Sequence, residues 1–174
     1  MADEPIPGDE LRKMNDPDSL SSPVWFHSKD PATGWLSNFS PHPFTLDGVR
    51  WPSVEHCFQA LKYPDPAVAA RIRAAESAAR ARKLGQDRSL AVRPDWAERR
   101  LAVMALALRA KFEQNRALGV RLLATGAAPL IHLSASDHFW GRSRDGEGEN
   151  RLGELLMALR REMAAVPPGR KARR

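Results

Sequence analysis

The segment of residues 51–62 constrains the fold of this chain more than any other stretch. It predicts where a helix starts and which residues lie on its polar and apolar faces. Its proline and serine at positions 52 and 53 indicate the start, since proline does not continue a strand and serine caps free backbone N–H groups. In a helix that begins there, Glu55, Gln59 and Lys62 fall at i, i+4 and i+7 and therefore share one face.

The opposite side of the same helix is apolar, with Val54, Phe58 and Leu61 in positions that face a core. A carboxylate, an amide and an amine on one face allow two interpretations, an ordinary solvated helix face or the wall of a binding site. Spacing alone favours the solvated face. Other segments of the chain favour the site.

Several further elements, in a fixed order, resemble the NADAR family from about Val24 to Met163. The matching elements are Leu36-Ser37-Asn38-Phe39, Trp51 to His56 with Phe58-Gln59-Ala60 and Lys62, Asp95-Trp96, Met104, Lys111-Phe112, Thr125, Asp137 with Trp140-Gly141, Gly148 with Asn150, Leu152-Gly153 and Leu155-Leu156-Met157. The resemblance covers nearly all of the chain outside its ends. Two positions depart from the family pattern: Gln86 stands where an Arg is usual, and His132 where a Glu is common.

Length and composition indicate a single domain with a real core. The chain has 174 residues, of which 43% are hydrophobic and five are tryptophan. The single cysteine, Cys57, excludes an internal disulfide. The sequence contains no run of about 20 apolar residues that could span a membrane. We therefore expect a cytoplasmic protein without a membrane partner.

The charge distribution separates the two ends from the body. Residues 1–22 carry six acidic and two basic side chains and predict a disordered acidic tail, whereas residues 164–174 carry four basic ones and predict a disordered basic tail. The net charges of the two ends cancel. Residues 23–163, the expected domain, therefore carry the net charge of +6. A basic body suits a phosphorylated ligand or nucleic acid, although solubility explains such a charge equally well.

The predicted fold class is α+β, a single compact and mainly helical domain with a few short strands. Short strands are expected near Val24–Phe26 and Phe44–Leu46, and Asp47-Gly48 predicts a hairpin turn. The expected helices are Ser53–Lys62, Pro66–Ala75, Ser77–Leu84, Asp95–Gln114, Arg116–Thr125 and Asn150–Ala164.

The sequence contains no pattern typical of a metal site or of a reactive thiol. The five histidines show no metal-ligand spacing, and Cys57 has no partner and fits a packing position. We expect neither a metal nor a cofactor.

The segment 141–153 is the strongest loop signal. Its glycines at 141, 146 and 148 allow close approach to a ligand, and Asn150 is a candidate N-cap of a helix whose N-terminus favours phosphate. An ordinary surface turn is the alternative. Trp140 beside Gly141 favours a site, because an indole can stack on a planar heterocycle. We expect a phosphate near Asn150 or near the arginines Arg142, Arg144 and Arg151.

Trp96 begins a long helix and fits either the core or the wall of a site, and the resemblance favours the site. The resemblance also implies that Asn38, Phe39 and Gln59 contact the substrate, with Gly141 and Asn150.

Glu55 and Asp137 form a candidate carboxylate pair. Cleavage of an N-glycosidic bond develops positive charge on the sugar and requires a proton on the leaving nitrogen or an activated water, and carboxylates serve both needs. Lys62 offers another route, because a lysine with a lowered pKa can attack a ring-opened sugar and form a Schiff base. The sequence leaves these catalytic roles open.

The resemblance implies a cofactor-free N-glycosidase that acts on phosphoribosylamino-pyrimidine intermediates of riboflavin biosynthesis and releases ribose 5-phosphate. A second activity implied by the family is removal of ADP-ribose from guanine in nucleic acid or nucleotides. A non-catalytic ADP-ribose-binding or nucleotide-binding module is a third interpretation, and the presence together of Glu55, Lys62 and Asp137 argues against it. The expected partner is thus a small phosphorylated substrate, with nucleic acid as partner under the second interpretation.

Overall fold

The structure, a computed structural model, describes residues 22–165. Its elements in chain order are β1 (Val24–Phe26), the short 3-10 helix η2 (Gly34–Leu36), β2 (Phe44–Leu46), β3 (Val49–Trp51), α2 (Val54–Leu61), α3 (Pro66–Arg73), α4 (Ala78–Leu84), α5 (Trp96–Gln114), α6 (Arg116–Ala124), β4 (Leu130–His132) and α7 (Arg151–Ala165). The predicted α+β, mainly helical class is confirmed. The two expected tails lie almost entirely outside the described residues, and α7 continues to Ala165.

The first three helices begin where their sequence predicts, because each has a polar cap. The Ser53 side chain accepts a hydrogen bond from the backbone N–H of His56, and the Ser77 side chain caps α4 in the same way. Asp65 caps α3 directly before Pro66, the residue type that best fits the first helical position. Local sequence therefore defines these three short helices, of which α2 and α4 line the site.

The strands form two separate pairs. β2 and β3 make the predicted antiparallel hairpin, and Asp47 and Gly48 have φ angles of 50° and 76°, as a type I′ turn requires. The parallel pairing of β1 with β4, which aligns Val24 with Leu130, was not predicted. This second pair brings the beginning of the domain beside the segment that precedes α7.

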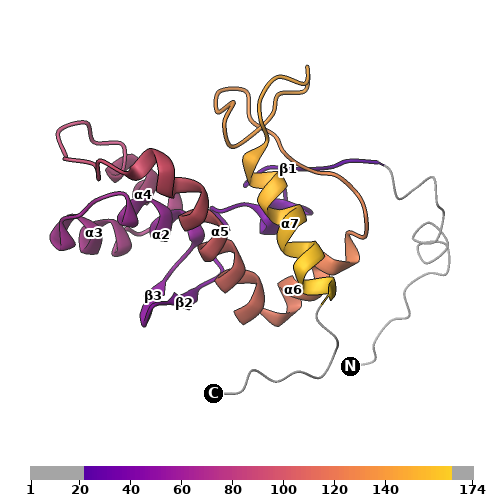
Figure 1. Cartoon of the computed structure of the whole chain (residues 1–174), viewed down its shortest axis with the longest axis horizontal. Helices are drawn as coiled ribbons and strands as arrows, with labels where there is room; N and C mark the ends of the chain where they lie inside the picture. Colours follow the sequence, from indigo (N-terminus) through magenta and orange to yellow (C-terminus); the bar gives the residue numbers. More distant parts are fainter. Residues whose placement is uncertain (1–21, 166–174) are drawn as a thin grey trace.

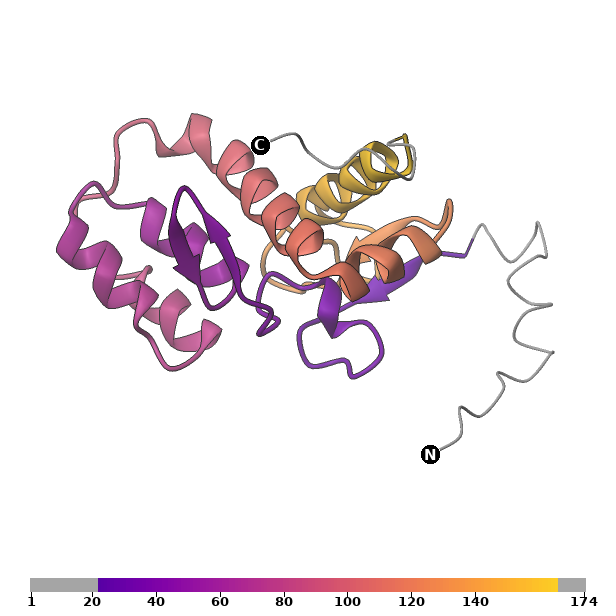
Figure 2. The same cartoon turned by 90° about the horizontal axis from the view of Figure 1, so that it is seen from below.

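Helix α5 runs through the middle of the molecule (Figures 1 and 2). Helices α2, α3 and α4 with the β2–β3 hairpin lie on one side of it, and α6, α7 and the β1–β4 pair lie on the other. Buried side chains of α5, among them Met104, Leu108 and Phe112, join both groups into one core. No helix within residues 22–165 has the length and apolar character needed to cross a membrane.

Candidate functional site

A cavity of about 630 Å³ opens between the two groups of helices. Its walls come from segments far apart in the chain: the residues after β1 and η2, helices α2, α4, α5 and α7, and the loop that follows β4. The predicted site residues that line it are Asn38, Phe39, Glu55, Gln59, Lys62, Trp96, Asp137 and Trp140. The polar face of α2 is therefore a cavity wall and not a solvated surface.

Glu55 is buried at the cavity wall, with 3% of its surface exposed. Its Oε1 accepts a hydrogen bond from Gln59 Nε2 at 2.9 Å, and its Oε2 accepts one from Asn38 Nδ2 at 2.5 Å. Burial raises the pKa of the Glu55 carboxyl, while the bond from Gln59, the positive charge of Arg82 and the bond from Asn38 oppose the increase. A carboxyl in this setting can hold a proton closer to neutral pH than an exposed glutamate.

Lys62 lies at the end of α2, and its Nζ donates to the carbonyl oxygen of Gly85 at 2.7 Å. Partial burial lowers the pKa of the Lys62 amine, and the nearby charge of Glu55 partly opposes this change. Gly85 also needs to be glycine, because a Cβ there would lie 2.2 Å from Gln59 Oε1. The turn after α4 thus holds Lys62 by its carbonyl and leaves room for Gln59 beside Glu55.

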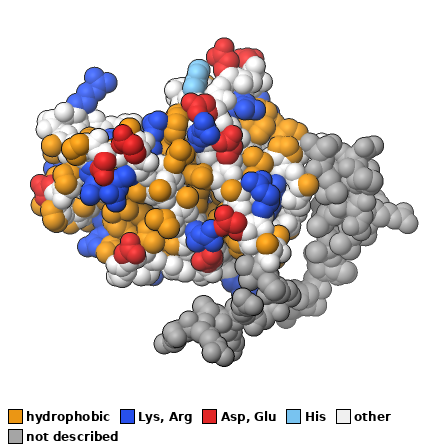
Figure 3. Space-filling model, viewed as in Figure 1, with side chains coloured by type: hydrophobic (Ala, Val, Ile, Leu, Met, Phe, Trp, Pro, Cys, Tyr) orange, Lys and Arg blue, Asp and Glu red, His pale blue; other side chains and the backbone are white. Residues whose placement is uncertain are grey.

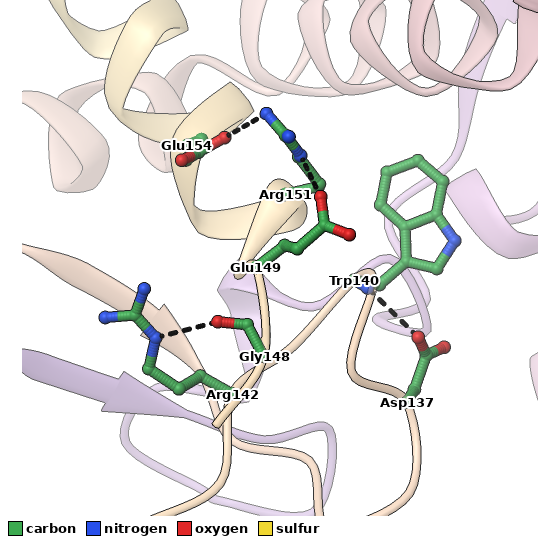
Figure 4. A network of polar contacts seen from close by, with 7 residues as sticks. All are labelled: Asp137, Trp140, Arg142, Gly148, Glu149, Arg151 and Glu154. Atoms are coloured by element: carbon green, nitrogen blue, oxygen red, sulfur yellow. Dashed lines mark hydrogen bonds and ion pairs between the residues drawn. The ribbon is translucent and has the colours of Figure 1, made fainter. Parts of the chain in front are cut away.

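Asp137 faces the same cavity from the loop after β4. Its Oδ1 accepts a hydrogen bond from the backbone N–H of Trp140 at 3.0 Å, as Figure 4 shows, and its own N–H donates to Ser134 Oγ. The negative charge of Asp137 is one of the causes that raise the pKa of Glu55. The two carboxyls predicted as a pair are therefore close enough to interact electrostatically.

Aromatic rings form the apolar part of the cavity wall. The ring of Phe58 packs against Trp96 with centroids 5.0 Å apart and against Trp140 edge-on at 5.4 Å. Phe58 was predicted to face the core, and it does so while also lining the cavity between the two indoles. Such a wall suits a flat heterocycle, because offset and edge-on contacts between rings are favourable.

Arg82 is the cavity-lining arginine that the sequence did not single out. It lies on α4 with its guanidinium 5.8 Å from the centre of the Phe39 ring, and it forms no ion pair within residues 22–165. Residues 71–93 contain six arginines, so no pattern distinguishes this one. Its position makes it the natural partner for an anionic group of a ligand.

The arginines expected at a phosphate do not line the cavity. Arg142 donates to the carbonyl oxygen of Gly148, and Arg151 bonds Glu149 and Glu154 (Figure 4). The guanidinium of Arg144 lies over the ring of Trp25 at 4.3 Å. These side chains are engaged in shaping the loop before α7, so the cavity does not support the expectation of a phosphate beside them.

Asn150 and Gly141 also lie outside the cavity lining. The Asn150 side chain is buried and bonds the backbone of β4, accepting from the His132 N–H at 2.9 Å and donating to the Leu130 carbonyl at 2.9 Å. Its side chain thus joins β4 to α7 and does not cap the helix. The backbone N–H groups of Arg151 and Leu152 donate to the carbonyls of residues 139 and 140, so they are not available to a phosphate.

Gln86 and His132, the two departures from the family pattern, both line the cavity. Burial lowers the pKa of His132, which favours its neutral form. Within residues 22–165 no group of three potential ligands could hold a metal ion. Cys57 is fully buried away from the cavity, and burial raises the pKa of its thiol to about 12, as expected for a packing residue.

Taken together, the cavity combines a proton donor, a second carboxyl, an amine and a stacking surface. This set can bind a flat base between rings, protonate a leaving nitrogen and stabilise positive charge on a sugar carbon. The amine adds a possible nucleophile.

The NADAR domain pattern matches residues 25–164 of the chain. N-glycosidase YbiA of Escherichia coli strain K12 is 43% identical over 139 residues, which cover 80% of this chain and 87% of that protein. The NMR structure of E. coli YbiA superposes with a TM-score of 0.76 at 41% identity, covering 83% of this chain and 86% of that one.

A longer relative is named for riboflavin biosynthesis. The riboflavin biosynthesis protein of Vibrio vulnificus is 40% identical over 149 residues, which cover 86% of this chain but 41% of that protein. The chain therefore corresponds to one part of this relative and to most of YbiA.

Proposed function

This chain belongs to the NADAR family and is an N-glycosidase of the YbiA kind, and we propose that it hydrolyses the ribosyl–nitrogen bond of phosphoribosylamino-pyrimidine intermediates of riboflavin biosynthesis. The products are ribose 5-phosphate and the free amino-pyrimidine. The observation that carries the proposal is the meeting of Glu55, Lys62 and Asp137 at one cavity with an aromatic wall.

The chemistry follows from the surroundings of each group. In the proposed pose the pyrimidine stacks against Trp96 and Trp140, and the ribosyl C1′ faces Glu55, which lines the same cavity. Glu55, whose pKa is raised by burial, donates its proton to the leaving nitrogen as the C1′–N bond breaks. Asp137 stabilises the positive charge that develops on the sugar, and a water completes the hydrolysis at C1′. In the alternative route Lys62 takes the place of that water as first nucleophile.

A small monophosphate fits the charges of the cavity better than a long polyanion. Among residues 22–165, Arg82 is the one arginine that lines the cavity, and Lys62 is engaged with Gly85. On the face seen in Figure 3, basic side chains are scattered among acidic ones and form no continuous tract. A substrate that presents one phosphate to Arg82 therefore satisfies the site.

The test is a direct comparison of two substrates. Purified protein is incubated with phosphoribosylamino-pyrimidine and with ADP-ribosylated guanine oligonucleotide, and release of ribose 5-phosphate or ADP-ribose is followed across salt concentrations. We expect turnover of the first, with a shallow salt dependence, since few phosphates are bound. Turnover of the oligonucleotide alone, with affinity that falls steeply as salt rises, would make ADP-ribose removal the function instead.

Replacing Arg82 tests where the phosphate lies. We expect Arg82→Gln to raise KM by about 10- to 100-fold with little change in kcat, because a hydrogen bond to a charged group contributes about 1.5–3 kcal/mol. Arg80→Gln is the matched control, an exposed arginine on the same helix. The loss should vanish with a substrate that lacks the phosphate. An equal loss with both substrates would assign Arg82 to another part of the ligand.

A further inference from the structure

Lys111 is a fully buried lysine that does not line the cavity. It lies on α5, and its Nζ donates three hydrogen bonds, to the carbonyl oxygens of Trp35 and Ser37 at 2.7 and 2.9 Å and to Ser40 Oγ at 2.7 Å. No carboxylate within residues 22–165 forms an ion pair with it. Its partners all belong to one segment, residues 35–40, here called the Trp35–Ser40 loop.

The number of acceptors matches the charged amine. An ammonium has three donors and no acceptor, so each of its N–H groups has one of the three oxygens, and the Ser40 hydroxyl in turn donates to the Ser37 carbonyl at 2.9 Å. Burying an unpaired charge is costly, and charge-assisted hydrogen bonds offset that cost. Burial lowers the pKa of Lys111 to about 7.

The loop leads directly to Glu55. Asn38 lies in its middle, and the Asn38 carbonyl accepts the backbone N–H of Glu55 at 2.9 Å while the Asn38 side chain donates to the Glu55 carboxyl. Ser37 Oγ, next to a carbonyl held by Lys111, accepts the N–H of Phe39 at 3.1 Å. One ammonium thus bonds residues on both sides of Asn38, the residue that bonds Glu55 twice.

We propose that Lys111 is a positioning residue for Glu55, which fixes the Trp35–Ser40 loop so that Asn38 holds the Glu55 carboxyl in place. The catalytic consequence rests on the proposed function, whereas the effect on Glu55 itself does not. Lys111 acts through Asn38 and contacts neither the cavity nor Glu55.

The direction of the effect follows from hydrogen bonding. The bond from Asn38 stabilises the Glu55 carboxylate and so lowers its pKa, and loss of this bond raises the pKa. The other groups that act on Glu55 are Gln59 and Lys62 on its own helix, Arg82 on α4 and Asp137 on the loop after β4. Of these groups, only Arg82 contacts the Trp35–Ser40 loop, with its guanidinium 5.8 Å from the centre of the Phe39 ring, and no hydrogen bond or ion pair joins any of the four to that loop.

The experiment is an NMR titration of the Glu55 carboxyl in protein labelled with ¹³C-glutamate, with the signal assigned from its absence in Glu55→Gln. We expect Lys111→Met to move the titration midpoint upward by about one pH unit, the equivalent of one charge-assisted hydrogen bond. Lys83→Met, the same change at an exposed lysine, should leave the midpoint where it is. This readout needs no substrate, so it distinguishes failure of the positioning role from failure of the proposed function.

A double variant separates positioning from general loosening of the fold. Asn38→Ala should move the midpoint by a similar amount, and adding Lys111→Met should then add little, because both changes remove the same bond. Ser40→Ala, which removes one of the three acceptors and keeps the lysine, gives a smaller upward shift and serves if Lys111→Met does not fold. An unchanged midpoint in Ser40→Ala and Lys111→Met, or fully additive shifts with Asn38→Ala, would overturn the proposal.

Discussion

Glu55→Gln is expected to lower kcat by about 100-fold or more while the protein stays folded, the usual scale for loss of a general acid. The substitution keeps the size of the side chain and removes its proton-transfer capacity. The new amide can be accommodated, because Gln59 can turn its own amide to offer an oxygen, and Asn38 still finds an acceptor. Steady-state kinetics and a melting curve measured on the same preparation check both parts.

The matched control is Glu76→Gln, an exposed glutamate just before α4, which should retain normal turnover.

The pH dependence of stability gives a second readout for Glu55→Gln. Since the pKa of Glu55 is raised in the folded protein, the folded state binds this proton more tightly than the unfolded chain. Protonation of Glu55 therefore contributes to the free energy of unfolding. This contribution is full below the unfolded pKa of about 4.5 and is lost as pH rises through the folded pKa. Glu55→Gln should remove this pH-dependent loss of stability. Near-normal turnover of Glu55→Gln would exclude Glu55 from catalysis.

The helices could be predicted from sequence because their signals are local. Ser53, Asp65 and Ser77 each stand directly before a helix and cap it, and Asp47-Gly48 determines a turn within a few residues. The pairing of β1 with β4 has no such signal. Each strand is three residues long, and its partner is chosen by packing between distant segments.

The site was predictable to the extent that its residues lie on regular elements. The spacing of Glu55, Gln59 and Lys62 placed them on one face correctly, but periodicity cannot tell a cavity wall from a solvated face. For Asn150 the error is in the other direction, because a residue expected to contact the substrate has a structural role. Its side chain bonds the backbone of β4. Arg82 could not be found because its role depends on where α4 packs against α2.

Lys62→Met is expected to lower kcat by about 100-fold or more if the amine attacks the sugar. The partly buried amine has a lowered pKa, so a larger share of it is neutral and nucleophilic near pH 7 than for an exposed lysine. Attack forms a bond from Nζ to C1′ as the C1′–N bond breaks, the pyrimidine leaves with the proton supplied by Glu55, and the Glu55 carboxylate takes one proton back from Nζ. The C1′–oxygen bond of the sugar ring then opens, the remaining Nζ proton passes to the ring oxygen, and the imine is formed. Water then hydrolyses the imine and frees the sugar phosphate and the lysine. Lys83→Met is the control and should retain full activity.

Borohydride separates this route from direct hydrolysis. Reduction during turnover should convert the imine into a stable secondary amine, which adds the mass of the sugar phosphate to the peptide that contains Lys62. If the kcat of Lys62→Met falls but no adduct forms in the unaltered protein, Lys62 acts by its charge alone.

The coupling of the two groups provides the final test, because the charge of Glu55 raises the pKa of Lys62. Groups that act in a single step are strongly non-additive, so the combined Glu55→Gln and Lys62→Met variant should be little slower than the slower single variant.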